Sequence, residues 1–201
     1  MQNVKKLAIF GQAGSGKTSL CNTLFGLNWK TDPAVDCTKS ICQHEGSFVP
    51  FLNGGQLPSW KLHDTPGVGA SEDIQQDRLQ ILSDTFHQVN VIIWVIQADT
   101  RALRVDQETI LELTNHGQKI PEAHLVLAIN QIDRVYPEDW DEINNIPSPE
   151  QQKIITEKIS LAHKRFAPYL PILIEHIVPC STVKKYGLEQ LVNLIHKPFY
   201  K

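Results

Sequence analysis

A complete phosphate-binding pattern lies near the start of the chain. Residues Gly11 to Thr18 read GQAGSGKT and match GxxxxGKS/T at every fixed position. Glycines let such a loop curl so that its backbone N–H groups face an anion, and the helix that follows presents its positive end to the same place. We therefore expect this loop to cradle the phosphates of a nucleotide, with Lys17 reaching the β- and γ-phosphates and the Thr18 hydroxyl binding Mg²⁺.

A carboxylate and a glycine follow the apolar residues Trp60 to His63, in the sequence Asp64-Thr65-Pro66-Gly67. A carboxylate at the end of a strand can hold Mg²⁺ directly or through water. The backbone N–H of Gly67 can approach a γ-phosphate closely because no side chain stands in the way. On its own this pattern is also an ordinary turn, and the phosphate-binding loop before it is what favours the nucleotide interpretation.

A third group of polar residues, Asn130-Gln131-Ile132-Asp133, follows the apolar run Leu125–Ile129. The Asp133 carboxylate could accept two hydrogen bonds, from the N1–H and the amino group of guanine. Adenine lacks both donors, and a site built on such polar pairing discriminates strongly between ligands. We expect Asn130 to tie this loop to the phosphate-binding loop. The three groups together predict a nucleotide site that prefers guanine.

Short apolar runs alternate with helix-like stretches, and these elements would position the three groups. The runs are dense in β-branched and large apolar residues, as are strands buried on both faces: Leu7–Phe10, Val91–Ile96, Leu125–Ile129 and the weaker His176–Val178. Helical spacing is found in Lys17–Phe25, Ile74–Phe86, Asp106–Asn115, Glu150–Phe166 and Leu188–His196. This alternation predicts an α/β fold with a doubly wound, mostly parallel sheet, whose loops at the carboxyl ends of the strands bind the ligand.

Two segments depart from this alternation. Residues 39–63 hold two apolar stretches around Asn53-Gly54-Gly55, which indicates a hairpin that adds one antiparallel edge strand to a six-stranded sheet. Residues 134–149 are rich in proline and acidic side chains and are expected to form a surface insertion. At its end, Ser148 and Gln151 could form a capping box, with Pro149 at the first position of a helix.

The composition fits one folded domain over residues 1–201. The chain has 41% hydrophobic and 20% charged residues and a formal net charge of -3, which argues against a disordered chain and against a general nucleic-acid-coating protein. Its four cysteines form no CxxC pair, so a zinc ribbon has no support and reduced thiols are favoured. No apolar run approaches the roughly 20 residues that span a bilayer. We expect a soluble cytoplasmic protein without a membrane span.

The three groups, in this order and each at the end of a strand, resemble the motifs of P-loop GTPase G domains of the translation-factor-related class. Within that class the chain is most similar to the Era/TrmE-like branch, and particularly to the bacterial YfjP/YeeP-type GTPases. The similarity to this subfamily rests on the segment from Trp140-Asp141-Glu142 to Pro147-Ser148-Pro149, and the whole resemblance runs from about Val4 to Pro198. It implies a G domain that binds GTP and GDP with Mg²⁺ and hydrolyses GTP.

The resemblance also implies roles for individual residues. Thr38 resembles the switch I threonine that contacts Mg²⁺ and the γ-phosphate, with Thr31 as a weaker candidate, and Gly67 lies at the start of switch II. Ser181-Thr182 resembles the loop whose backbone N–H, here that of Thr182, meets guanine O6. The residues implied in hydrolysis are Lys17, Thr38 and Gly67, and the implied metal ligands are Thr18, Thr38 and Asp64. The residues implied to contact the nucleotide are Gly11, Ala13, Gly14, Ser15, Gly16, Lys17, Thr18, Ser19, Asp64, Gly67, Asn130, Gln131, Asp133, Ser181 and Thr182.

Three departures from the family pattern bear on affinity and rate. Gln131 replaces the usual lysine, whose aliphatic stem packs on the base, and this predicts a lower nucleotide affinity. Val68 occupies the position where many relatives carry a glutamine that aligns water. Gly14 occupies the position of an asparagine that holds K⁺ in another set of relatives. We therefore expect slow intrinsic hydrolysis that needs a partner, a dimer interface or a switch rearrangement for acceleration.

Two other functions stay open at this point. An ATP-using P-loop enzyme such as a small-molecule kinase is less favoured, because Asp133 selects guanine and no arginine-rich lid is evident. A nucleotide-gated interaction module that holds GTP without turnover is made credible by Val68. The effector or activating protein is unknown, a nucleotide-dependent dimer is conceivable, and ribosomal RNA is suggested as a partner by family analogy only.

Overall fold

Six strands form one sheet in the computed structural model, which describes residues 4–31, 40–49, 58–68, 75–100 and 103–199. The strands are β1 (Lys5–Phe10), β2 (Cys42–Gly46), β3 (Trp60–Asp64), β4 (Val91–Gln97), β5 (His124–Asn130) and β6 (Ile177–Pro179). Their order across the sheet is β2-β3-β1-β4-β5-β6, with β2 antiparallel to β3 and the other neighbouring pairs parallel. The predicted six-stranded, mostly parallel sheet with one antiparallel edge strand is therefore confirmed.

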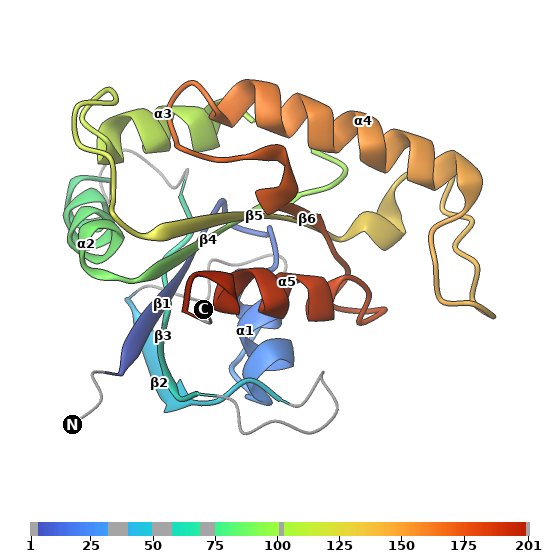
Figure 1. Ribbon diagram of the computed structural model, residues 1–201, viewed down its shortest axis with the longest axis horizontal. Helices are drawn as coiled ribbons and strands as arrows, with labels where there is room; N and C mark the ends of the chain where they lie inside the picture. The colour runs from blue at the N-terminus through green and yellow to red at the C-terminus, as the bar shows by residue number, and fades with distance from the viewer. Residues whose placement is uncertain (1–3, 32–39, 50–57, 69–74, 101–102, 200–201) are drawn as a thin grey trace.

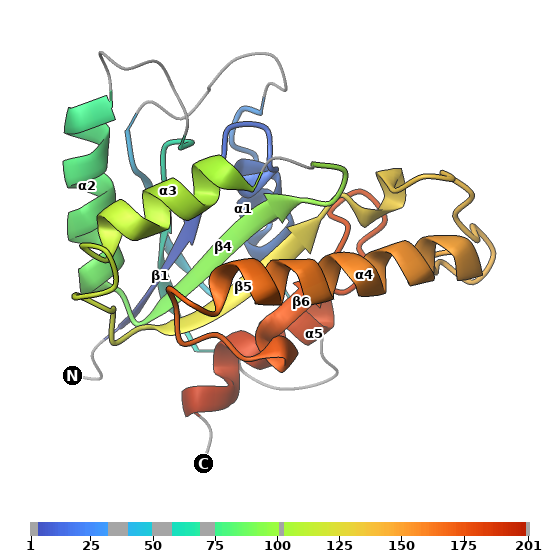
Figure 2. The same cartoon turned by 90° about the horizontal axis from the view of Figure 1, so that it is seen from above.

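Helices cover both faces of the sheet (Figure 1). On one face lie α2 (Gln75–Gln88), α3 (Arg104–Leu113) and α4 (Pro149–Phe166), and on the other lie α1 (Lys17–Phe25) and α5 (Leu188–His196), as the turned view also shows (Figure 2). Side chains of a strand alternate between the faces, so Ala8 and Phe10 pack into one core and Leu7 and Ile9 into the other. Short 3₁₀ helices within the described residues are η2 (Ile132–Arg134), η3 (Ile174–His176) and η4 (Lys197–Phe199).

The helix predicted over Asp106–Asn115 is displaced, because α3 begins at Arg104 and ends at Leu113. The end is set locally. The Thr114 N–H still donates to the Ile110 carbonyl oxygen at 2.9 Å, and the Thr114 hydroxyl accepts from the Gly117 N–H at 3.1 Å just beyond the helix. Asn115 and His116 then adopt positive φ angles of 46° and 55°, and the helix cannot continue through them.

The other predicted boundaries that lie in the described residues agree to within one or two residues, and the last strand is shifted by one residue. His176 belongs to η3 rather than to the strand predicted over His176–Val178, and β6 runs from Ile177 to Pro179. The predicted start of the second helix at Ile74 and the hairpin turn at Asn53-Gly54-Gly55 lie outside the described residues.

The capping box expected at the start of α4 is confirmed. The Ser148 hydroxyl accepts a hydrogen bond from the Gln151 backbone N–H at 3.1 Å, the Gln151 side chain accepts one from the Ser148 N–H at 3.2 Å, and Pro149 is the first helical residue. The expectation of a surface insertion before this helix is wrong for Trp140. This side chain is only 8% exposed and packs into the core beneath α4.

The described cysteines are free thiols, and Cys37 lies outside the described residues. Cys21 and Cys180 are buried and Cys42 is exposed. Burial raises the pKa of Cys180 to about 12, so this thiol stays protonated at physiological pH. No helix in the described part of the chain combines the length and the apolar character that crossing a membrane requires.

His196, the last residue of α5, is buried against the core between the sheet and helices α1 and α5. The Trp60 indole N–H donates to His196 Nε2 at 3.2 Å, and the two rings stack with centroids 5.7 Å apart. Burial, followed by the nearby charge of Lys5, lowers the pKa of His196. The folded protein therefore favours the neutral ring.

We expect the free energy of unfolding to fall as the pH is lowered from about 7.5 to about 5.5. Below the ordinary histidine pKa of about 6.5 the unfolded chain binds a proton at His196, whereas the folded chain binds it only at a lower pH. The stabilisation from the neutral ring is thus present above this range and lost as the pH falls through it. His196→Gln keeps an acceptor for Trp60 but cannot titrate, so its stability should fall less in urea unfolding over the same range. A variant with the full wild-type pH dependence would exclude His196 as the source.

Candidate nucleotide-binding site

The loop between β1 and α1 takes a shape that only glycine permits at two of its positions. At Gly11, with φ of 139°, a Cβ atom would lie 2.1 Å from the carbonyl oxygen of Val95. At Gly16, with φ of 90°, a Cβ atom would lie 2.4 Å from Nδ2 of Asn130. The loop can therefore lie directly against β4 and the end of β5, as the phosphate-binding interpretation requires.

Hydroxyl and carboxylate oxygens meet beside this loop. Thr18 Oγ1, in the first turn of α1, donates to Asp64 Oδ2 at the end of β3 with a distance of 2.7 Å. Mg²⁺ prefers oxygen ligands of these two kinds, so the donor set fits this ion. The third expected ligand, Thr38, lies outside the described residues. Nearby, Lys17 Nζ donates to the Gln12 carbonyl oxygen at 2.9 Å, which keeps the ammonium group at the phosphate-binding loop.

The residues after β3 lie against the same loop. A Cβ atom on Gly67 would be 2.8 Å from the Ala13 Cα, so glycine is required for this approach. The Val68 N–H donates to the Gly11 carbonyl oxygen at 3.2 Å, and the Ala13 N–H donates to the Val68 carbonyl oxygen at 3.4 Å. The Val68 side chain is 6% exposed and belongs to the core. The start of the expected switch II is thereby held next to the phosphate-binding loop.

The Asn130 side chain makes the tie that the sequence predicts. It is fully buried, and its Nδ2 donates to the carbonyl oxygen of Ser15 at 3.0 Å. Its Oδ1 accepts a long hydrogen bond of 3.4 Å from the backbone N–H of Thr182. Three loops, from β1, β5 and β6, therefore meet at one amide group.

Gln131 occupies the position where the family pattern has lysine, and its contacts explain how the chain accommodates the change. Its backbone is left-handed, with φ of 63°. Its Nε2 donates to the Gly14 carbonyl oxygen at 3.0 Å, while its Oε1 accepts from Arg134 Nη1 at 3.0 Å. The side chain thus lies along the phosphate-binding loop and links it to the base-reading loop.

The Asp133 carboxylate matches the donor pattern of guanine. Its Oδ1 is buried and accepts no hydrogen bond from any residue that the structure describes. A buried acceptor left in this state costs free energy, so it is normally paired with a ligand or water. The N1–H and amino group of guanine are suitable donors. Asp133 and Asn130 are therefore brought together at one edge of the sheet, as their spacing suggests.

The loop after β6 is held by its own hydrogen bonds, and the backbone N–H of Thr182 in this loop donates within the protein. Ser181 is buried and pairs with Tyr186 through both backbone groups, and its Oγ accepts from the Lys184 N–H at 3.0 Å. The Thr182 N–H, expected to meet guanine O6, instead donates to Asn130 Oδ1 at the long distance given above. A role of this amide in base recognition stays a prediction.

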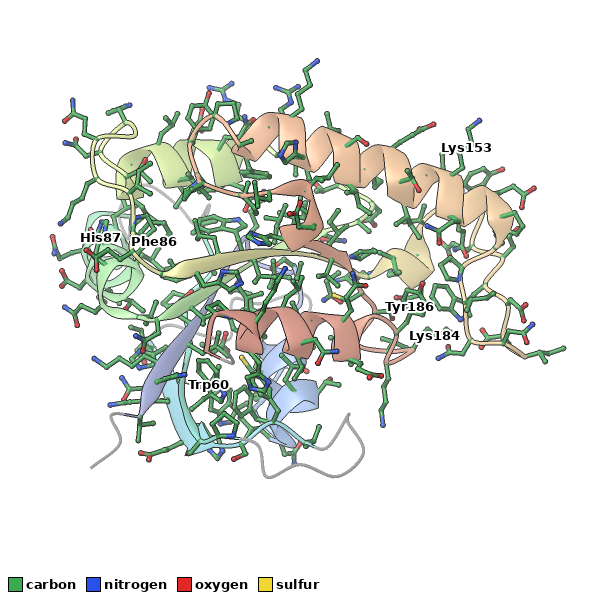
Figure 3. The ribbon with its side chains drawn as sticks, viewed as in Figure 1. Trp60, Phe86, His87, Lys153, Lys184 and Tyr186 are labelled. Carbon is green, nitrogen blue, oxygen red and sulfur yellow. The ribbon has the colours of Figure 1, made fainter. Side chains whose placement is uncertain are left out.

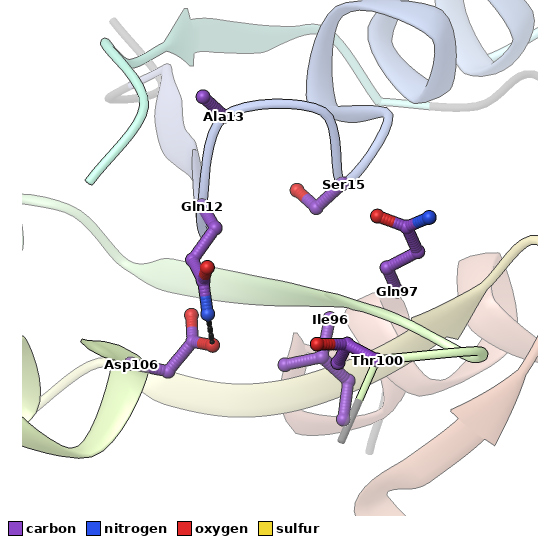
Figure 4. Close-up of a pocket in the computed structure, with 7 residues that line it drawn as sticks. All are labelled: Gln12, Ala13, Ser15, Ile96, Gln97, Thr100 and Asp106. Atoms are coloured by element: carbon purple, nitrogen blue, oxygen red, sulfur yellow. Dashed lines mark hydrogen bonds between the residues drawn. The ribbon is translucent and has the colours of Figure 1, made fainter. Parts of the chain in front are cut away.

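The sequence reasoning did not single out Asp106 in α3, a buried residue that contacts the phosphate-binding loop. Its carboxylate accepts a hydrogen bond from the Gln12 side chain (Figure 4). It also accepts one from Trp94 Nε1 at 2.8 Å. Burial raises the pKa of this carboxyl, although both hydrogen bonds and the charge of Lys17 act in the opposite direction. The spacing in the sequence could have indicated its burial, because Asp106 shares a helix face with apolar residues four and seven positions later.

A small cavity lies beside this contact between Asp106 and the phosphate-binding loop. It measures about 20 Å³, room for one water molecule, and Ser15 and Thr100 line it together with Asp106. Ser15 Oγ is buried and has no hydrogen-bond partner among the described residues. The contact between Gln12 and Asp106 thus anchors the second residue of the phosphate-binding loop to α3.

Comparisons with known proteins agree with this geometry. Residues 6–131 match the model of the family described as 50S ribosome-binding GTPase. The uncharacterized protein YfjP of Escherichia coli (strain K12) is 30% identical over 169 residues, which are 83% of this chain and 54% of YfjP. GTPase HflX of Saccharolobus solfataricus is 26% identical over 97% of this chain and 49% of its own length. The chain spans about half the length of these relatives.

Solved structures share the fold. Era in complex with MgGDPNP and nucleotides 1506–1542 of 16S ribosomal RNA superposes with a TM-score of 0.70 and 23% identity, covering 98% of this chain and 57% of that chain. A probable GTP-binding protein, EngB, has a TM-score of 0.65 and 15% identity, and the match covers 96% of this chain and 97% of that chain.

We expect Asp106→Asn to lower the free energy of unfolding by about 1–3 kcal/mol, because the new amide N–H₂ would face either the Gln12 or the Trp94 donor. Chemical denaturation measures the loss. Glu112→Gln makes the same chemical change at an exposed position of the same helix and should leave stability nearly unaltered. Equal stability of the two variants would contradict an anchoring role for Asp106.

Proposed function

Because the chain belongs to the 50S ribosome-binding GTPase family, we propose that it is a guanine-nucleotide switch that binds GTP or GDP with Mg²⁺ and hydrolyses GTP slowly on its own. The observation that carries this proposal is the buried acceptor Oδ1 of Asp133, which lies in the loop that Asn130 joins to the phosphate-binding loop. A carboxylate placed in this way favours guanine over adenine.

In this proposal the nucleotide lies along the carboxyl ends of β1, β3, β5 and β6. Backbone N–H groups from Ala13 to Ser19 and the Lys17 ammonium hold the phosphates. Thr18 and Asp64 hold Mg²⁺, with Thr38 as the switch I ligand. Asp133 accepts from the base, Gln131 supports it, and the loop at Ser181 and Thr182 covers O6.

The proposed slow rate follows from what surrounds the γ-phosphate position. Bound Mg²⁺ would neutralise part of the negative charge that develops on the leaving group. Lys17 and the loop N–H groups stabilise the same charge, and the Gly67 N–H can contact the γ-phosphate. Val68 is apolar and packed in the core, and Gly14 has no side chain, so neither can orient a water molecule.

The same arrangement supports a switch with an external partner. Loss of the γ-phosphate would release the contacts of Thr38 and Gly67, which is how such switches change state. The group that completes hydrolysis is proposed to come from an effector, a second copy of the chain or a rearranged switch. Since Era is seen with 16S ribosomal RNA, ribosomal RNA is the partner class to test first. A cytoplasmic location and a single G domain over residues 1–201 belong to the same proposal.

One alternative keeps support from a specific observation. With Val68 packed in the core, the chain could act as a nucleotide-gated interaction module that holds GTP without cleaving it. An ATP-using kinase is disfavoured by the acceptor geometry of Asp133.

We expect Asp133→Asn to weaken GDP binding by about 100-fold and to strengthen binding of xanthosine diphosphate. One charge-assisted hydrogen bond becomes a neutral one and the other is replaced by two donors that face each other. With xanthine, the asparagine amide can instead donate to the C2 carbonyl. Competition of GDP, xanthosine diphosphate and ADP against a fluorescent nucleotide measures the change. Glu138→Gln, an exposed carboxylate nearby, is the control. A variant that still prefers guanine would refute the base-reading role of Asp133.

We expect the purified protein to cleave bound GTP well below about 1 s⁻¹, the lower end of ordinary enzyme turnover. Single-turnover hydrolysis in the presence of Mg²⁺ gives this rate directly. Faster turnover would contradict the inference from Val68 and Gly14. Cleavage that stays undetectable with every candidate activator would favour the interaction module.

A further inference from the structure

The acidic insertion before α4 packs against the loop that follows β6. Trp140, a buried residue of the insertion, meets the ring of Tyr186 edge-on, with centroids 5.4 Å apart and planes at 87°. Lys184 and Tyr186 lie on the side of the molecule where the insertion leads into the start of α4 (Figure 3). The insertion is therefore in contact with the same loop that holds Ser181 and Thr182.

Asn145 makes the polar link between the two segments. Its Nδ2 donates to the Lys184 carbonyl oxygen at 3.0 Å, and its Oδ1 accepts from Trp140 Nε1 at 3.1 Å. The backbone of Asn145 has a φ of 52°, a left-handed conformation that asparagine tolerates better than most residues. Lys184 also forms an exposed ion pair with Glu142, but exposed pairs add little to stability. Asn145 is itself exposed, but its amide joins two partners at once, and the hydrogen bond from Trp140 is partly buried.

The other end of the insertion supports the base-reading loop. Gln151, in the first turn of α4, is fully buried, and its Nε2 donates to the Val135 carbonyl oxygen at 2.9 Å and to that of Asp133 at 3.4 Å. Ser148 Oγ donates to Asp139 at 2.6 Å, which joins the helix start to the insertion. Residues 139–151 therefore contact both loops from which the base would be read, and we name them the base-loop brace.

Building on the proposed function, we propose that the base-loop brace sets how tightly this chain holds guanine, with Asn145 and Gln151 as positioning residues. Asn145 holds the 181–186 loop so that the Thr182 N–H can reach O6. Gln151 holds the backbone of Asp133. A loop that is already in its binding conformation loses less entropy when the ligand arrives, so the brace increases affinity without touching the nucleotide.

Asn145→Asp tests the first half with little change in shape. The aspartate still fits a left-handed backbone and still accepts from Trp140, but it places an oxygen against the Lys184 carbonyl. Asn144→Asp is the matched control, since Asn144 donates at 2.7 Å to Asp141 within the insertion and the added charge is one position away. Asn145→Gly removes both hydrogen bonds without adding charge and tolerates the same φ. Urea unfolding of each variant separates loss of fold from loss of position.

The readout is the dissociation constant for GDP and two analogues, each displacing a fluorescent nucleotide from the full chain with Mg²⁺. Inosine diphosphate lacks only the amino group that Asp133 would contact. 6-Thio-GDP replaces O6 with a poorer acceptor and keeps the N1–H and the amino group. A general loss of stability would not distinguish between the two analogues, whereas displacement of the Thr182 N–H would.

We expect Asn145→Asp and Asn145→Gly to raise the dissociation constant for GDP by about 3- to 10-fold, the range for loss of one neutral hydrogen bond. The wild-type penalty for 6-thio-GDP should shrink in both, and the penalty for inosine diphosphate should stay the same. If Asn144→Asp has the same effect, or if both penalties change together, the brace is overturned while the proposed function stands. If the wild-type chain does not prefer GDP to ADP, the proposed function fails and the brace with it.

Discussion

The side chain of Asn130 connects three loops through one buried amide. It donates to the carbonyl oxygen of Ser15 at 3.0 Å and accepts from the Thr182 N–H at 3.4 Å. Gly16 must be a glycine because any Cβ atom there would collide with the same amide group. Leaving a buried amide unpaired costs about 1–3 kcal/mol, so the phosphate-binding loop and the base-reading loops must keep this arrangement together. Phosphate and base recognition are therefore parts of one structural unit.

This unit is supported from both sides by residues outside the motifs. On one side, Asp106 of α3 holds the side chain of Gln12, so the phosphate-binding loop depends on a helix that contributes nothing to the motif itself. On the other side, Asn145 and Gln151 hold the loops that carry Thr182 and Asp133. Asp106 and Gln151 are buried polar groups, for which a satisfied hydrogen bond is specific and an unsatisfied one is costly, whereas Asn145 is exposed and acts through two hydrogen bonds. The positions of the motif residues are thus shared with the rest of the fold.

Prediction from sequence succeeded where a pattern has one dominant physical cause. The buried strands are continuous apolar runs, and all of those predicted were located to within one or two residues. The end of α3 was predicted two residues too late because it depends on the left-handed residues Asn115 and His116, which the periodicity of apolar residues does not reveal. Gln131 was expected only to weaken binding, yet its amide contacts the Gly14 carbonyl oxygen, a partner that no local pattern reveals. Residues 134–149 were expected to form a surface insertion, but Trp140 within them is buried in the core and contacts the ring of Tyr186, which is distant in sequence.

The sequence by itself determined the fold class, the glycine-dependent loop and the order of the motifs, because these follow from local geometry and from the periodicity of apolar residues. Only the tertiary structure decided which polar groups hold the motifs in place. Asp106, Asn145 and Gln151 have no signature of their own, since each acts on a loop that reaches it only after the sheet has formed. The free energy of such contacts depends on burial and on a partner distant in sequence, and neither is encoded in the spacing of neighbouring residues.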